Sequence, residues 1–207
     1  MKKMKNIAAK YRLAFSKTLL VVFIIVLVIS DHGVVKSQGV SIAMDLIGFI
    51  MVLIGGIGRL WSSLYIEGNK NRKLISDGPY SMMRNPLYIF SMLLLIGYIL
   101  LIKSIIIGVL FLSIFMLLYM STIYNEEKIL LSRHDSAYME YFRKTPRFIP
   151  KLSLYKASNS QTSIDINVKK IESVMIEVAG FILFFGLIKL LDILHKAEYI
   201  KTYLTLY

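Results

Sequence analysis

Residues 87–123 read LYIFSMLLLIGYILLIKSIIIGVLFLSIFMLLYMSTI, and this stretch decides the fold. Its only charged residue is Lys103. As one helix it would be roughly 55 Å long, well beyond a hydrocarbon core of roughly 30 Å. We therefore predict that the chain turns back at Lys103-Ser104. The result is two apolar helices, over residues 87–103 and 105–123, with almost no loop between them.

The composition of the whole chain is that of a membrane protein. Of its 207 residues, 56% are hydrophobic, against about 45–50% in soluble domains. There is no cysteine, which excludes disulfides, thiolate catalysis and cysteine-ligated metal centres. The net charge of +12 gathers in the N-terminal tail and two interhelical stretches, which is typical of contact with anionic lipid headgroups. We predict an all-α integral membrane protein with four to five transmembrane helices, which contacts membrane lipids and binds no nucleic acid.

Two further spans are predicted before the hairpin. Residues 13–30 follow a basic tail, and a signal peptide is the alternative, although Ser30-Asp31-His32-Gly33 offers no small-residue cleavage site. Residues 40–65 form the second span and contain Asp45 and Arg59. These two lie roughly 21 Å apart on a helix, so they cannot pair with each other. Ionisable residues within a span are functional candidates unless they reach the membrane surface.

After the hairpin the chain becomes polar and then apolar again. Residues 157–170 are a polar linker, and residues 171–207 form a C-terminal apolar helix. This helix is predicted as a fifth span, with an amphipathic helix in the membrane interface as the alternative.

Charge predicts the orientation of these spans. The N-terminal tail, the loop over residues 67–86 and the stretch over residues 125–170 are rich in Lys and Arg, whereas the alternate loops are not. By the positive-inside rule, the N-terminus and both polar stretches face the cytosol.

The first polar block, Asp77–Tyr88, lies directly before the hairpin. Asp77-Gly78-Pro79 predicts a turn, and Arg84-Asn85-Pro86 predicts a break before the next helix. Tyr80, Arg84, Asn85 and Tyr88 can converge there. Aromatic rings, a cation and an amide suit a ligand with a planar base and an anionic group. A membrane-interface anchor is the alternative.

The second polar block, Glu126–Pro150, lies directly after the hairpin. Because a tight hairpin returns the chain to the side it left, we expect the two blocks to be adjacent. Carboxylates of Glu126 and Glu127 can accept bonds from ribose hydroxyls, neutralise a cationic ligand or pair with Arg84. Apolar residues at helical spacing predict a lid helix over residues 126–144, in which Tyr138 and Tyr141 are packing residues.

The sequence contains neither the histidine spacing of a metal site nor a glycine-rich phosphate-binding loop. The histidines His32, His134 and His195 are scattered and lack metal-site spacing, so no metal site is predicted. Gly55-Gly56-Ile57-Gly58 lies inside a span, which indicates close helix packing rather than a phosphate loop.

The ordered set of motifs resembles the isoprenylcysteine carboxyl methyltransferase and phospholipid methyltransferase group. The resemblance covers about residues 58–150 and is carried by LISDGPY at 74–80, RNPLY at 84–88, EE at 126–127 and PRFIP at 146–150, with Arg59-Leu60-Trp61, Leu130, Tyr138 and Tyr141 between them. It implies a transmembrane methyltransferase core over residues 1–156. The cofactor S-adenosylmethionine would occupy a cytosolic pocket formed by loops and the lid helix.

The resemblance also implies site residues. Those matching cofactor-binding positions are Arg72, Lys73, Leu74, Ile75, Tyr80, Asn85, Tyr88 and Glu126. The catalytic candidates are Arg84, which would hold the site or an anionic substrate group, and Glu127, which with His134 is a candidate base for a thiol or amine acceptor. A carboxylate acceptor needs no base.

The sequence departs from this group at three places that bear on the acceptor. Asn85 stands where His is common, Thr122 stands where eukaryotic carboxyl methyltransferases carry a substrate-binding Arg, and His134-Asp135 replaces the usual Phe-Gly. The resemblance therefore implies a lipid-like or small apolar methyl acceptor that reaches the site laterally, rather than a prenylcysteine carboxylate. Two alternatives remain open: a membrane reductase using a nicotinamide cofactor, and a non-enzymatic lipid-binding or scaffold protein.

Overall fold

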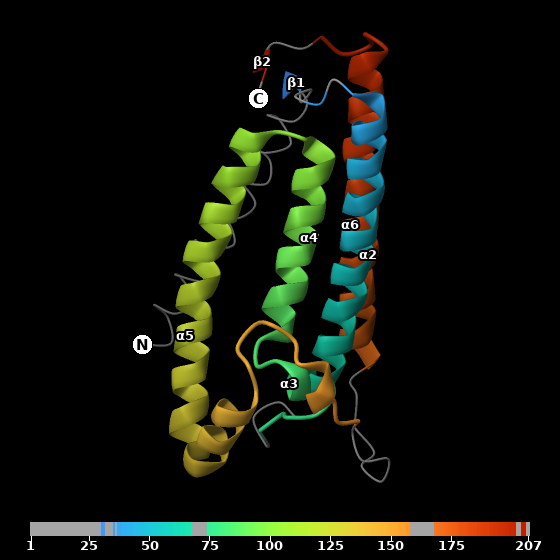
Figure 1. Ribbon diagram of the computed structural model, residues 1–207. Helices are drawn as coiled ribbons and strands as arrows, with labels where there is room; N and C mark the ends of the chain where they lie inside the picture. Colours follow the sequence, from blue (N-terminus) through green and yellow to red (C-terminus); the bar gives the residue numbers. More distant parts are fainter. Residues whose placement is uncertain are drawn as a thin grey trace, which may run out of the picture.

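The computed structural model describes residues 30–31, 35, 37–67, 74–157, 168–201 and 204–205. These hold the α-helices α2 (Gln38–Glu67), α3 (Pro79–Met82), α4 (Pro86–Ile102), α5 (Ile105–Lys144) and α6 (Val168–Lys196), the short 3-10 helix η1 (Leu152–Leu154), and the two-residue strands β1 (Ser30–Asp31) and β2 (Leu204–Thr205), which pair in parallel (Figure 1). The all-α class is thereby confirmed. The span predicted over residues 13–30 lies outside the described residues.

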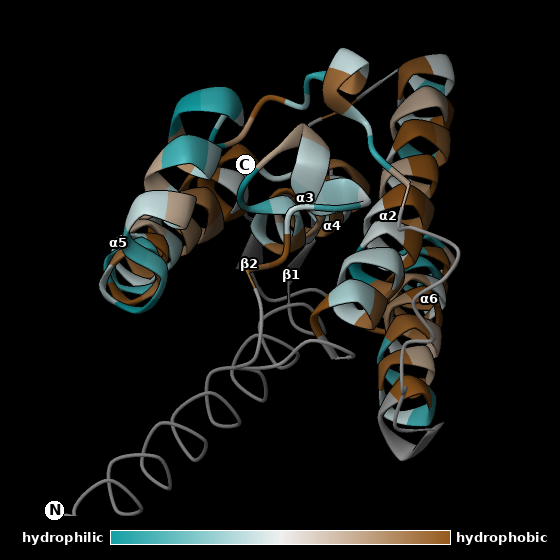
Figure 2. Ribbon diagram, turned by 90° about the horizontal axis from the view of Figure 1, so that it is seen from below, coloured by the Kyte–Doolittle hydropathy of each residue, from teal (hydrophilic) through white to brown (hydrophobic). Residues whose placement is uncertain are grey.

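The helices have the length and surface of an integral membrane protein. In the described part of the chain, α2, α5 and α6 are long and apolar enough to cross a membrane, and α4 is a shorter apolar helix. Large aliphatic side chains point outward along them; Leu117, for example, is 75% exposed. Figure 2 shows that α2 and α6 consist largely of apolar residues. Lipid contact explains such exposure, because the hydrocarbon takes the place of a protein core.

Glycines bring α2 and α4 into backbone contact. A Cβ added to Gly48 would lie 2.7 Å from the carbonyl oxygen of Gly97, and one added to Gly97 would lie 2.6 Å from that of Gly48. Nearer the polar blocks, a Cβ on Gly55 would lie 2.8 Å from the carbonyl oxygen of Phe90. The close packing predicted for the glycines at 55–58 is confirmed, and α2 and α4 are packed closely against each other.

Helix α6 runs antiparallel to α2 along its length (Figures 1 and 2). Two ion pairs join the helices, Arg59–Glu177 at 2.5 Å and Asp45–Lys189 at 2.5 Å, and they lie roughly 20 Å apart along the helix axes. Lys103, at the hairpin tip, also pairs with Asp45 at 2.6 Å. The C-terminal helix therefore runs along the bundle rather than across its end.

The chain reverses between α4 and α5 at Lys103-Ser104. Lys103 has the left-handed conformation (φ 58°) that ends α4, and the Ser104 hydroxyl accepts a hydrogen bond from the Ile107 amide at 3.3 Å, which caps the start of α5. From this tip α5 diverges from α4 towards the polar blocks (Figure 1).

Helix α5 does not break where the fourth span and the lid helix were expected to be separate. It continues through residues 123–126 as a helix of 40 residues, and its backbone departs from helical geometry only at Asp135 (φ 37°, ψ −111°). Residues 124–134, YNEEKILLSRH, contain neither Gly nor Pro and are rich in helix-forming Glu, Lys and Leu. A change from apolar to charged side chains moves the helix out of the hydrocarbon, but it does not end the helix.

Candidate active site

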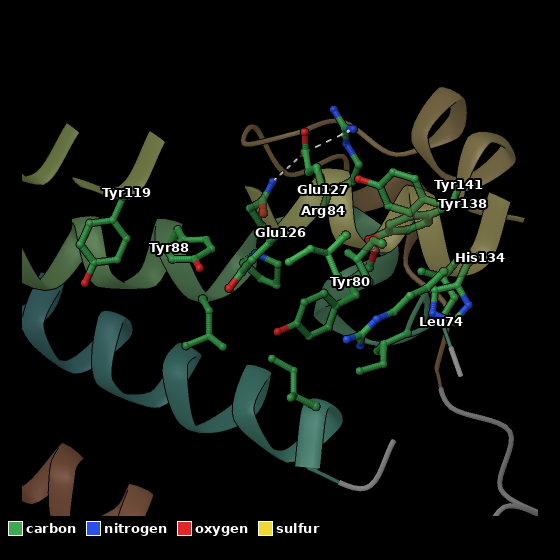
Figure 3. Close-up of a pocket in the computed structure, with 18 of the residues that line it drawn as sticks. Leu74, Tyr80, Arg84, Tyr88, Tyr119, Glu126, Glu127, His134, Tyr138 and Tyr141 are labelled. Atoms are coloured by element: carbon green, nitrogen blue, oxygen red, sulfur yellow. Dashed lines mark hydrogen bonds and ion pairs between the residues drawn. The ribbon is translucent and has the colours of Figure 1, made fainter. Parts of the chain in front are cut away.

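A cavity of about 540 Å³ lies at the end of the bundle opposite the hairpin tip (Figure 3). This volume is in the usual range for small-molecule and cofactor sites. Its walls come from α2, the segment before α3, α3, α4 and α5. The residues that line it are Arg59, Ile66, Leu74, Ile75, Tyr80, Arg84, Asn85, Pro86, Leu87, Tyr88, Ser91, Tyr119, Glu126, Glu127, Ile129, Leu130, Arg133, His134, Tyr138 and Tyr141.

The cavity brings the two polar blocks together. Eight of the ten candidate site residues line it: Leu74, Ile75, Tyr80, Arg84, Asn85, Tyr88, Glu126 and Glu127. Arg72 and Lys73 lie outside the described residues. Their roles remain predictions, but the expectation that the two blocks are adjacent holds for every described member.

The turn at Asp77-Gly78-Pro79 shapes the first block. Gly78 has a φ of 58°, and a Cβ there would lie 2.3 Å from the ring of Tyr65, so both the conformation and the space require glycine. Pro79 starts α3, and its fixed φ suits the first helical position. This short helix places Tyr80 in the cavity wall.

The chain after α5 crosses beneath the first block and is bonded to it through the backbone. The amide of Arg84 donates to the carbonyl of Pro146 at 2.8 Å, and that of Lys151 donates to the carbonyl of Met82 at 3.1 Å. The amide of Gly78 donates to the carbonyl of Lys156 at 2.8 Å. The first polar block is thus held in place by α4 on one side and by the chain that follows α5 on the other.

Glu127 joins the two blocks through its carboxylate. It accepts hydrogen bonds from Asn85 Nδ2 and from Arg147 Nε, each at 3.2 Å, and its Oε1 lies 3.4 Å from Arg84 Nη1. Arg147 Nη2 also donates to Oε2. Bonding to Glu127 raises the pKa of Arg147. Because Glu127 is only 8% exposed and its oxygens are engaged, it is placed to hold three side chains in position.

Arg84 is fixed between the blocks. Its guanidinium carbon lies 3.9 Å from the ring centroid of Phe142, and its side chain is only 9% exposed. Stacking on an aromatic face and pairing with a carboxylate are the interactions that favour arginine over lysine.

Several buried polar atoms of cavity-lining residues have no hydrogen-bond partner in the protein, although Arg84 Nη1 is ion-paired with Glu127. In the described part of the chain, six buried side-chain atoms lack a hydrogen bond, and five of them belong to residues that line the cavity: Arg59 Nε, Arg84 Nε and Nη1, and the hydroxyls of Tyr80 and Tyr138. Buried polar groups are normally hydrogen-bonded, so this concentration indicates a site that receives a polar ligand. Burial raises the pKa of Tyr80, which keeps its hydroxyl neutral and able to donate.

Tyr138 and Tyr141 pack as predicted and also complete the wall. Both are buried, and the hydroxyl of Tyr141 donates to the backbone carbonyl of Tyr80 at 2.8 Å. The turn of α5 after Asp135 is thereby fastened to α3.

An aromatic wall stands on the side of α4 and α5. The ring of Tyr88 meets the edge of Tyr119 at 5.2 Å between centroids, and Tyr119 stacks on Phe115 at 4.1 Å. Glu126 is exposed in the cavity and interacts with the side chain of Tyr88. A carboxylate beside aromatic faces can hold a cationic or hydroxyl-bearing ligand.

Sequence reasoning gave no site role to Tyr119, Ser91 or Arg147. An aromatic or a serine within a span carries no signal of its own, and Arg147 was noted only as part of a motif. Arg59 had a usable signal, because it is a charge within a span. Thr122 does not line the cavity, and its hydroxyl bonds to the carbonyl of Leu118 at 2.8 Å.

Comparison with known proteins agrees with this architecture. Residues 44–135 match the family model described as phospholipid methyltransferase, which spans α2, α3, α4 and α5 up to its departure at Asp135. Residues 44–135 are therefore similar to the isoprenylcysteine and phospholipid methyltransferase family. Helix α6 and the segment over residues 136–157 lie outside the match.

Two curated relatives are similar over most of their length. The chain is 29% identical over 204 residues to the cobalt-zinc-cadmium resistance protein CzcN of Cupriavidus metallidurans, covering 97% of this chain and 91% of that protein. It is 28% identical over 183 residues to the nickel-cobalt-cadmium resistance protein NccN of Alcaligenes xylosoxydans xylosoxydans, covering 88% of this chain and 84% of that protein. No solved structure matches the chain. Among the described residues, no group of three or more His, Asp or Glu side chains is arranged to hold a metal ion.

Proposed function

We propose that this protein is an S-adenosylmethionine-dependent methyltransferase that methylates a lipid-like or small apolar acceptor from the cytosolic side of the membrane. The observation that supports it best is the cavity between the two polar blocks, where buried polar atoms of Arg59, Arg84 and Tyr80 have no hydrogen-bond partner. The family of residues 44–135 supplies the reaction class.

The residues of the cavity fit the parts of such a cofactor. Glu126, exposed beside Tyr88, is suited to accept hydrogen bonds from ribose hydroxyls or to face a positive charge. The Tyr80 hydroxyl, buried and unpartnered, is suited to a polar group of the adenine or of the amino acid portion. The cofactor itself supplies an activated methyl group on a sulfonium centre.

The protein's own contribution is alignment and exclusion of water. Tyr138 and Tyr141 line the cavity on one side, and residues of α2 and α4 line it on the other. Holding donor and acceptor in line is a large part of the barrier reduction in such transfers. The engagement of Glu127 with Asn85 and Arg147 favours a positioning role for it over that of a general base. A carboxylate acceptor would need no base at all.

Titration calorimetry on the purified protein in a neutral detergent tests the proposal. S-adenosylmethionine should bind, and Asn85→Ala should weaken binding because it removes a group in the cavity wall. Thr122→Ala is the matched control, since Thr122 lies outside the cavity, and it should bind as the wild type does. A folded protein that takes up no S-adenosylmethionine at millimolar concentration, or that binds a nicotinamide dinucleotide in its place, would overturn the proposal.

A further inference from the structure

Arg59 is a cavity residue that lies within the membrane-spanning part of the fold. It stands on α2 eight residues before the helix ends at Glu67, which places it roughly 12 Å inside that end. Ser91 of α4 lines the cavity beside it. The cavity therefore reaches from the polar blocks to a cationic floor at the level of the hydrocarbon.

The bonds that Arg59 makes leave part of its guanidinium unused. Its Nη2 lies 2.5 Å from a carboxylate oxygen of Glu177 on α6, and its Nη1 donates to the hydroxyl of Ser91. Its Nε is buried and has no hydrogen-bond partner. An arginine has five N–H donors, and an unsatisfied one in a low-dielectric setting costs free energy. An ionisable group at this depth marks a binding site when a cavity adjoins it.

Joining α6 to α2 does not by itself account for Arg59. The same two helices are joined at their other end by Asp45 and Lys189, and neither of those residues lines the cavity. The Asp45–Lys189 pair, which also includes Lys103, lies away from the cavity, whereas the Arg59–Glu177 pair has its cation in the cavity wall. Both cavity arginines lie near an aromatic ring and a carboxylate: Arg84 with Phe142 and Glu127, and Arg59 with Phe181, 5.7 Å from its ring centroid, and Glu177.

We propose that Arg59 binds an anionic group of the methyl acceptor at the floor of the cavity, and that Glu177 is a positioning residue that holds the guanidinium there. The inference rests on the proposed function and specifies its substrate class as an amphiphile with a phosphate or carboxylate near the methylated atom. Its apolar tail lies along the aliphatic faces of the spans. Helix α6, which lies outside the family match, thereby takes part in substrate selection.

Direct binding of simple amphiphiles tests this without any methyl transfer. Titration calorimetry compares dodecyl phosphate, dodecanoate and the uncharged dodecanol, each added to protein in a neutral maltoside detergent. At least one anionic amphiphile should bind about tenfold or more tightly than the uncharged alcohol, since a hydrogen bond between ionised groups is stronger than a neutral one. Equal affinity for all three overturns the proposal. The two anionic arms show whether phosphate or carboxylate is preferred.

Variants then assign the effect to Arg59. Arg59→Gln should remove the preference for the anion, and Glu177→Gln should weaken it. Asp45→Asn is the matched control, because it loosens the same two helices at their far end, and it should keep the preference. If Asp45→Asn loses as much as Arg59→Gln, the effect is structural and the proposal fails.

A charge exchange separates the binding role from the helix link. The double variant Arg59→Glu with Glu177→Arg restores an ion pair between α2 and α6 but presents a carboxylate to the cavity. It should keep the thermal stability of the wild type and bind no anionic amphiphile. Restored binding would overturn the proposal. Titration of S-adenosylmethionine into the same samples tests the two proposals separately. Cofactor binding without anion binding would contradict the role of Arg59 but not the proposed methyltransferase function.

Discussion

Glu126 and Glu127 are neighbours on α5, yet their carboxylates lie in different surroundings. Glu127 is buried and bonded to Asn85 and Arg147, whereas Glu126 is exposed in the cavity beside Tyr88. Successive residues of an α-helix point about 100° apart. Both carboxylates line the cavity, but that of Glu127 is turned towards Asn85 and Arg84 (Figure 3).

This difference predicts that the same substitution lowers the stability of the protein at Glu127 but weakens cofactor binding at Glu126. Glu127→Gln should lower the stability by about 3 kcal/mol or more, because it removes the charge that compensates the buried Arg84. Glu126→Gln should change stability by less than about 0.5 kcal/mol but weaken S-adenosylmethionine binding. Thermal unfolding followed by circular dichroism, together with calorimetric titration, measures both. A stable Glu127→Gln beside an unstable Glu126→Gln would contradict the assignment.

Asp135 has a positive φ of 37° at the point where α5 departs from helical geometry, and residues with a side chain adopt such conformations at a cost of about 1–3 kcal/mol. Asp135→Gly should therefore raise the unfolding temperature by a few degrees. Asp135→Ala keeps a Cβ and should not. Equal shifts for both substitutions would mean that the gain comes from loss of the carboxylate rather than from relief of strain.

Gly97 lies against the backbone of Gly48, where an added methyl group meets a carbonyl oxygen at 2.6 Å. Gly97→Ala should force α2 and α4 apart and destabilise the protein by about 1–3 kcal/mol. Gly180→Ala on α6 is the matched control, because nothing lies within 4 Å of its Cβ position. It should be neutral or slightly stabilising, since alanine favours the helix. Both effects are measured as a shift in the detergent or denaturant concentration at which the protein loses its helicity.

The Tyr80 hydroxyl has no protein partner, so Tyr80→Phe should preserve stability near neutral pH while weakening S-adenosylmethionine binding. Burial raises the pKa of Tyr80, so the folded protein holds this proton more tightly than the unfolded chain does. The associated stability is fully present below about pH 10, the ordinary tyrosine value, and falls as the pH rises further. Alkaline unfolding of Tyr80→Phe should consequently be less steep above pH 10 than that of the wild type.

The fold class was predictable because its determinants are local. The length of the apolar stretch around Lys103 forces a reversal, and the structure ends α4 and begins α5 there. The glycines at 55–58 likewise indicated close packing. The extent of α5 was not predictable, because the loss of apolar side chains after Ile123 resembles a helix end, while the backbone there remains fully able to form a helix.

The candidate site was predictable as two adjacent blocks, but its internal bonds were not. The pairing of Glu127 with Arg147 and of Arg59 with Glu177 joins residues far apart in the chain, and no periodicity or motif reports such contacts. Asp45 and Arg59 were rightly judged unable to pair with each other. Each has an ion-pair partner on α6, whose position along α2 the sequence left open.

Because α5 is a single helix from Ile105 to its departure at Asp135, its two halves move together. The membrane half, which carries Tyr119, and the half that carries Glu126 and His134 cannot change direction separately. A membrane helix adjusts its tilt to the thickness of the hydrocarbon around it, and any tilt about the hairpin tip moves those three residues together, relative to α2 and α4. The width of the cavity is thereby tied to the thickness of the bilayer.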